Sequence, residues 1–199
     1  MSFPEESPNS RGQGASSRLE ARNLLRSNQR VLMSNTPEER SAEVKRIARK
    51  LAPHMAKRVS WNEAGYIECD FVRRDLGLDG VSTIFNPEKW ESERLLYAIA
   101  VTLGQVLYLE IYGKMPILQR NPTTAEEVQQ RDKDWRSGRH QRYCRRLDRM
   151  VLALLQNAGV PNAREKYCAY LGQVKPHSPD PKIAEIVRLR QAELSKPEG

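Results

Sequence analysis

The spacing of apolar and polar positions predicts a mainly helical protein. The clearest case is residues 131–155, where apolar side chains recur every three or four positions, as along one face of an α-helix. We therefore expect one amphipathic helix here. Gly138 is the position at which this helix could bend or divide, because glycine is a common cause of kinks. The apolar face contains Tyr143, Leu147, Met150, Val151 and Leu154.

The opposite face of this expected helix is strongly basic. At about 100° per residue, five arginines fall within an arc of roughly 120°. We call these residues the arginine stripe: Arg139, Arg142, Arg145, Arg146 and Arg149. Asp148, the one acidic residue between its ends, points away from its centre. Trp135 falls in the same arc if the helix runs unbroken through Gly138, which would place an aromatic ring among the arginines.

A second helix is expected at about residues 87–112. Asn86, followed by proline, provides a start signal and Gly113 a stop signal. The apolar residues surround the helix axis, so this should be the central helix of a compact bundle. Thr102 and Glu110 interrupt the apolar run, which falls short of the roughly 20 apolar residues of a bilayer span. We expect a buried helix, not a membrane anchor.

A capping box at Thr36 to Glu39, with proline at the first helical position, starts a helix that ends near Pro53. Its apolar side contains Val44, Ile47, Ala48 and Leu51. Its other side, which we call the second basic face, contains Lys45, Arg46, Arg49 and Lys50. Basic helix backs also serve solubility, so this face alone is the lesser indication of binding. Together with the arginine stripe it could form two walls of one groove.

Residues 59–85 allow two interpretations. Alternation of Ile67, Cys69 and Phe71 favours a strand, paired in a hairpin around residues 63–65. A helix from residue 62 to 76, closed by a glycine, is the other possibility and the one that we favour.

The remaining segments complete the predicted organisation. Residues 1–17 form a disordered tail, since they lack apolar content, and residues 18–172 form one helical domain. Residues 173–199 hold a proline-containing linker and a last helix that begins at Pro181. This helix could dock on the domain or on a partner.

The charge distribution is polarised. Residues 18–58 carry eleven Lys or Arg and four Glu, and residues 131–149 carry eight basic and three acidic residues. The segment between them, 59–130, holds six basic and eleven acidic residues, so two basic segments flank an acidic middle. Three cysteines in no disulfide or zinc pattern, and a first segment unlike a secretory signal, indicate an intracellular protein.

Catalytic and metal-binding signatures are not recognisable in the sequence. His140 and Cys144 have the four-residue spacing of two helical metal ligands, but no second pair is spaced to complete a tetrahedral site, so we expect a packed histidine. The acidic residues between 63 and 79 follow no metal-dependent catalytic spacing. We therefore predict no enzymatic activity, no metal and no cofactor.

The arginine stripe is the best indication of function. Guanidinium groups bind phosphate oxygens bidentately and keep their charge at any working pH. We therefore expect a non-enzymatic protein that contacts the DNA or RNA backbone through the stripe, Trp135 and the second basic face, as an accessory subunit of a nucleoprotein assembly such as that of a mobile element, virus or defence system. A helical adaptor for an acidic protein is the alternative. A helix-turn-helix regulator, with its second helix within residues 71–84, is the third possibility.

Overall fold

A computed structural model describes residues 36–62, 65–73, 78–84, 91–115, 124–173 and 181–196. The chain divides into Met1–Thr36 and Pro37–Gly199, and the fold described below belongs to the second of these units. The predicted tail at residues 1–17 lies outside the described residues, as does most of the linker before the last helix.

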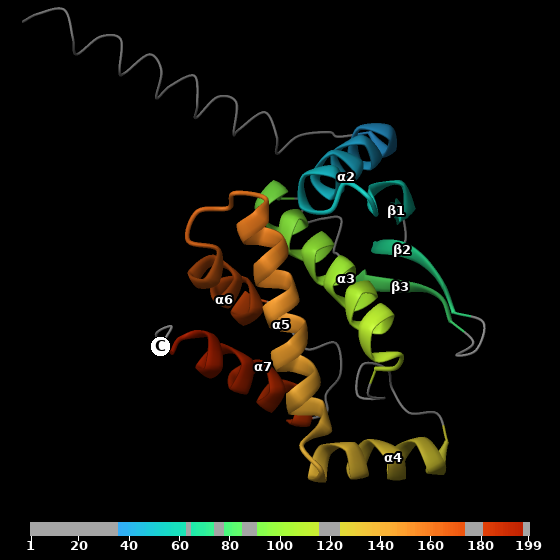
Figure 1. Ribbon diagram of the computed structural model, residues 1–199, viewed down its shortest axis with the longest axis vertical. Coiled ribbons are helices and arrows are strands. Elements are labelled where there is room, and N and C mark those ends of the chain that lie inside the picture. The colour runs from blue at the N-terminus through green and yellow to red at the C-terminus, as the bar shows by residue number, and fades with distance from the viewer. Residues whose placement is uncertain are drawn as a thin grey trace, which may run out of the picture. The chain divides into compact units, whose positions relative to one another are not determined.

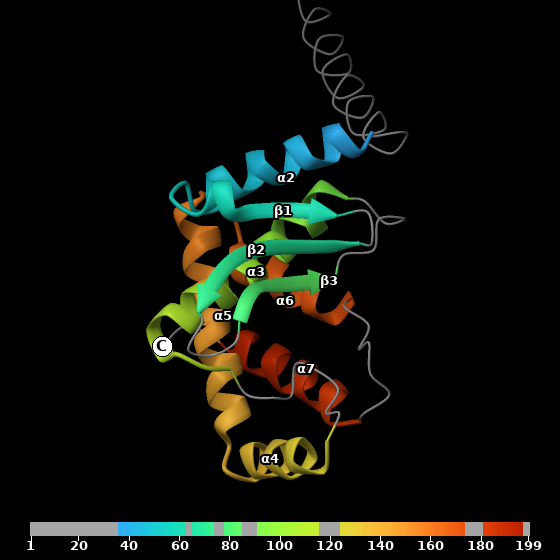
Figure 2. The same cartoon turned by 90° about the vertical axis from the view of Figure 1, so that its right-hand side faces the viewer.

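The described residues form a mainly helical fold with a small antiparallel sheet (Figures 1 and 2). The α-helices are α2 (Pro37–Leu51), α3 (Ser92–Tyr112), α4 (Ala125–Arg136), α5 (Arg139–Asn157), α6 (Ala163–Gln173) and α7 (Pro181–Leu194). A short 3-10 helix, η1 (Ala56–Arg58), precedes three strands in sequential order: β1 (Val59–Asn62), β2 (Tyr66–Arg73) and β3 (Leu78–Ile84). The expected bundle around a central apolar helix is confirmed.

Helix α3 is that central helix. It packs against β2 and β3 on one side, against α5 on the other, and also against α2 and α6. Within the described part of the chain it begins at Ser92, later than expected, while the start signal at Asn86 lies outside that part. By length and composition α3 could also cross a membrane, and 67% of its most apolar window is buried inside the protein.

Helices α3 and α5 approach each other closely at Gly104. A Cβ atom there would lie 2.9 Å from Cγ2 of Val151 and 3.1 Å from Cδ1 of Leu147, which are shorter than ordinary van der Waals contacts. The missing side chain therefore lets two α5 residues pack against the α3 backbone. Both Leu147 and Val151 belong to the apolar face expected from the sequence, and both are buried.

The expectation of one unbroken helix over residues 131–155 is wrong. Helix α4 ends at Arg136, and α5 begins at Arg139 in a different direction (Figure 1). Gly138 between them has φ 66° and ψ 13°, a left-handed conformation that glycine adopts without steric cost. Thr124 caps α4 as expected, because its side chain accepts a hydrogen bond from the backbone N–H of Glu127.

The favoured helix over residues 62–76 is also wrong, because β1, β2 and β3 form a meander there. The alternation of Ile67, Cys69 and Phe71 is that of a strand: all three are buried on the sheet face toward α3, while Asp70 is exposed. Val59 pairs with Cys69, so the first two strands share this face. The described residues of 71–84 are likewise strands, which excludes the second helix that a helix-turn-helix regulator would need there.

The C-terminal helix α7 docks on the domain, which settles the open choice between domain and partner. It contacts α6 and α5, and Ile186 and Leu194 are buried in these contacts.

We predict that Gly104→Val lowers the free energy of unfolding by about 1–3 kcal/mol, because the new methyl groups would overlap Leu147 and Val151. Ala153→Val, at an exposed position of α5, serves as the control and should cost less than about 1 kcal/mol. Urea unfolding measures both. Equal losses in the two variants would contradict the close approach of α3 and α5.

Candidate nucleic-acid interface

The structure divides the arginine stripe into one half-buried and four exposed residues. The exposed ones are Arg142, Arg145, Arg146 and Arg149. They occupy positions i, i+3, i+4 and i+7 of α5 and extend over about 10 Å of helix. The apolar face of α5 is held against α3, so these four side chains project from the side of α5 that faces solvent.

Arg139, the fifth member of the stripe, is bound to a buried carboxylate. Its Nη1 atom lies 3.3 Å from Oδ1 of Asp134, a residue of α4 that is only 3% exposed. Gln130 donates a second hydrogen bond to the same oxygen, at 2.8 Å. Arg139 therefore joins α5 to α4, and its charge is less available to an external anion than that of the other four.

The four exposed arginines have no carboxylate partner among the residues that the structure describes. Arg142 donates a hydrogen bond to the carbonyl oxygen of Ser137 at 2.9 Å, and the guanidinium carbon of Arg146 lies 4.3 Å from the centroid of the Tyr112 ring. Within the described part of the chain, none of the four forms an ion pair. Their positive charge is therefore not neutralised locally.

Glu193 of α7 also interacts electrostatically with the stripe. The pKa of Glu193 is lowered chiefly by the hydrogen bond and charge of Lys196, with smaller contributions from Arg145 and Arg149. Its carboxylate is paired with Lys196 at 2.9 Å, so it compensates the two arginines only from a distance.

Trp135 does not share the face of the arginine stripe, because the helix is broken at Gly138. Its ring belongs to α4, is partly buried against the core, and lies with its centroid 6.4 Å from that of His140. His140 is a buried residue of α5 at only 2% exposure. This placement directs Trp135 toward the protein interior, and the geometric basis for its expected stacking role is lost.

An aromatic residue that the sequence analysis did not single out lies beside the stripe instead. Tyr112, the last residue of α3, is 42% exposed and carries the Arg146 guanidinium over its ring. Its neighbour Ile111 is 63% exposed. No local sequence signal pairs Tyr112 with Arg146, because the contact depends on the packing of α3 against α5.

A buried ion pair fixes α7 next to the stripe. Arg190 of α7 donates from Nε to both carboxylate oxygens of Asp148 on α5, each at 3.1 Å, and from Nη2 to the Tyr167 hydroxyl at 2.8 Å. The Tyr167 hydroxyl of α6 in turn donates to Asp148 at 2.9 Å. Asp148 is 5% exposed, so the acidic residue that the sequence placed off the centre of the stripe is a buried link among three helices.

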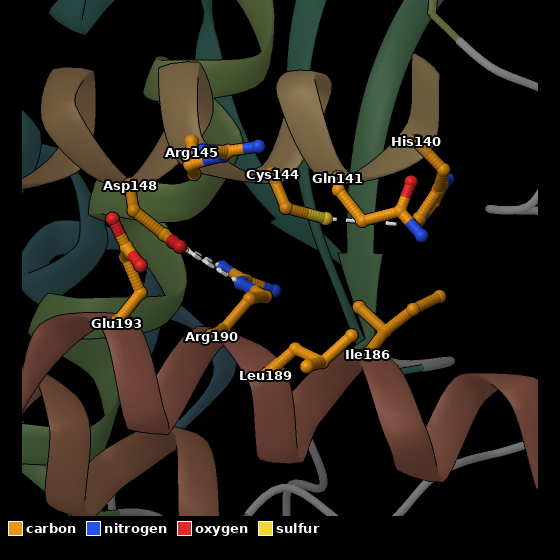
Figure 3. A pocket seen from close by; sticks show the side chains of 9 residues that line it. All are labelled: His140, Gln141, Cys144, Arg145, Asp148, Ile186, Leu189, Arg190 and Glu193. Atoms are coloured by element: carbon orange, nitrogen blue, oxygen red, sulfur yellow. Dashed lines mark hydrogen bonds and ion pairs between the residues drawn. The ribbon is translucent and has the colours of Figure 1, made fainter. Parts of the chain in front are cut away.

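A cavity of about 210 Å³ lies between α5 and α7 around this ion pair (Figure 3). Its lining includes His140, Cys144, Ile186 and Leu189. Nε2 of His140 lies 3.5 Å from Sγ of Cys144, and burial lowers the pKa of His140 to about 4, so the imidazole is neutral near pH 7. Burial likewise raises the pKa of the Cys144 thiol to about 11. His140 is thus a packed histidine.

Metal-binding geometry is not found in the described residues. No group of three or more His, Cys, Asp or Glu side chains there is arranged to hold an ion. Among these residues, no third ligand accompanies His140 and Cys144. Near pH 7 the His140 ring is neutral and the Cys144 thiol is protonated.

The second basic face lies on α2, where Lys45, Arg46, Arg49 and Lys50 are all exposed. Arg46 makes a 3.8 Å contact with Glu43. Both views place α2 far from α4, whereas the arginine stripe begins beside α4 (Figures 1 and 2). We therefore treat the two as separate basic surfaces of one fold, and not as facing walls of one groove.

Comparisons with protein-family models, with curated proteins and with solved structures gave no match. The described residues define a mainly helical protein with a three-stranded antiparallel sheet and two exposed basic helix faces. The function must therefore be inferred from the surface chemistry.

We predict that Arg190→Leu lowers the free energy of unfolding by about 3–5 kcal/mol, because it leaves the buried Asp148 carboxylate without its cation. The double variant Asp148→Leu/Arg190→Leu should recover part of this loss. Arg188→Leu, at an exposed position of α7, is the control and should change stability by less than about 0.5 kcal/mol. Additive losses in the double variant would show that the two residues do not interact energetically.

Proposed function

We propose that this protein is a non-enzymatic, nucleic-acid-binding subunit that contacts the sugar-phosphate backbone through the arginine stripe. The observation that carries the proposal is the set of four exposed arginines on one face of α5 that no described carboxylate neutralises. If the stripe were only a solvated surface, neighbouring acidic residues would be expected to relieve the repulsion among like charges.

The chemistry of arginine suits a phosphate ligand. The planar guanidinium group presents paired N–H donors that match two phosphate oxygens, and it stays charged at any physiological pH. The four groups project from one helix that is anchored along its apolar face. Because this helix is already held in place, binding has to immobilise little of the backbone that carries the arginines. Each phosphate contact releases condensed counterions, which makes the affinity fall with salt.

The other basic and acidic regions support a role within an assembly. We assign the second basic face on α2 as an additional, lesser phosphate contact, because its four basic residues are exposed but one of them lies near Glu43. The acidic middle of the sequence includes the exposed Asp70 on the outward face of the sheet, which is available to a protein neighbour. The free cysteines Cys69, Cys144 and Cys168 accord with an intracellular location.

An acidic protein partner is the second candidate ligand. The specific observation in its favour is the exposed pair Ile111 and Tyr112 beside Arg146, since tyrosine and arginine are enriched at protein interfaces. This adaptor would occupy the same surface. The test below distinguishes the adaptor from a nucleic-acid-binding protein, because an adaptor should show no measurable oligonucleotide binding near physiological salt.

We predict that changing Arg142, Arg145, Arg146 and Arg149 together to Gln weakens binding to a short random-sequence oligonucleotide and flattens its salt dependence. For duplex DNA the slope of log affinity against log salt should become less steep by roughly 0.9 for each phosphate contact removed. Fluorescence anisotropy at several salt concentrations measures both quantities. Circular dichroism should remain unchanged, because the four side chains are exposed.

The matched control removes the same amount of charge elsewhere. Lys45, Arg46, Arg49 and Lys50 changed together to Gln should reduce affinity and slope less than the α5 variant does. Equal effects of the two quadruple variants would mean that net charge, not the arginine stripe, drives binding. No binding by the unaltered protein to duplex or single strand would reject the proposal in favour of the adaptor.

A further inference from the structure

The last turn of α3 exposes an unusual group of side chains beside the stripe. Gly113 ends the helix with φ 82°, so the chain turns away immediately after Tyr112. Ile111 and Tyr112 remain 63% and 42% exposed, and the Arg146 guanidinium lies over the Tyr112 ring at 4.3 Å. We call Ile111, Tyr112 and Arg146 the Tyr112 platform.

The Tyr112 platform is supported from the core by two further rings. The Tyr108 centroid lies 4.7 Å from that of Tyr112, with the planes tilted by 39°. Tyr108 in turn meets Tyr143 edge to face, at 4.6 Å and 82°, and Tyr143 is completely buried. Three rings thus lead from the interior to the surface, and this support holds Tyr112 in place before any ligand binds.

The Tyr112 platform and the arginines around it together suit a ligand in which a base lies next to a phosphate. Guanidinium planes and aromatic rings are the surfaces on which unpaired bases stack, and the neighbouring Arg142, Arg145 and Arg149 supply charge for the strand to which the base belongs. Bases of a duplex have their faces covered by their neighbours, whereas bases of a single strand can be splayed onto such a platform.

We propose that the protein prefers single-stranded nucleic acid and that an unpaired base stacks on the Tyr112 platform. This inference rests on the proposed function, since it takes the arginine stripe as the backbone contact. It replaces the role that the sequence suggested for Trp135 with a residue 23 positions earlier in the chain. Stacking is tolerant of base identity, so little sequence preference accompanies it.

The test compares Tyr112→Ala, Tyr112→Leu and Tyr112→Phe on oligothymidine, oligouridine and a DNA duplex of the same length. Alanine and leucine should each weaken binding to both single strands by roughly five- to 150-fold, because neither retains a ring, and phenylalanine should bind as the unaltered protein does. Binding to the duplex should change less than twofold. Circular dichroism and thermal melting confirm that each variant is folded, and the leucine variant keeps apolar bulk against Tyr108 if the alanine variant is unstable.

Photocrosslinking gives a direct readout on the unaltered protein. An oligonucleotide that carries 5-iodouridine should crosslink to a peptide containing Tyr112, and the crosslink should be lost on competition with oligothymidine. Crosslinks confined to other peptides would overturn the inference. So would single-strand affinity that survives Tyr112→Leu, or an equal loss on duplex and single strand. In those cases the quadruple arginine variant still decides the proposed function independently.

Discussion

The packing of α5 against α3 is the interaction on which the surface of this protein depends. Gly104 lets Leu147 and Val151 approach the α3 backbone, and this contact fixes which side of α5 is buried. Arg142, Arg145, Arg146 and Arg149 occupy the arc that this packing leaves open, so they face solvent. The same contact brings the end of α3 alongside α5 and thereby places Tyr112 beneath Arg146, although the two residues are 34 positions apart.

The distribution of charge on α5 follows from the neighbours of each position. Asp148 lies where α6 and α7 cover the helix, and it is stabilised there by Arg190 and Tyr167. We infer that this buried pair favours one docked position for α7, since alternative positions would leave a charge buried without a partner. Arg142, Arg145, Arg146 and Arg149 lie outside this arrangement, and within the described part of the chain none of them forms an ion pair.

Local sequence patterns predicted the helices well because their periodicity is determined by the chain itself. The apolar face of α5 and the all-round apolar character of α3 were legible from residue spacing, and so was the start of α2 after Thr36. The strands over residues 59–84 were wrongly predicted as a helix, because a short amphipathic run fits both the helical and the strand period. The pairing of Cys69 with Val59 and Val81 distinguishes the two. That pairing is a long-range property.

The candidate site was predicted in part for the same reason. The arginine stripe lies on one helix, so its exposed members could be found from their spacing, whereas the engagement of Arg139 with Asp134 depends on the left-handed turn at Gly138. Trp135 was assigned to the stripe on the assumption of a continuous helix. Tyr112 was missed because residues from separate helices become neighbours only through tertiary packing.

If the exposed arginines of α5 contact nucleic acid, a bound strand should shield their side chains, and chemical footprinting measures this shielding. The protein would be treated with phenylglyoxal, which modifies accessible arginines, with and without saturating oligothymidine, and the modified sites quantified by mass spectrometry. We expect strong protection of Arg142, Arg145, Arg146 and Arg149, with Arg188 on α7 modified equally in both samples. Equal modification of the four stripe residues in the free and bound protein would contradict this contact.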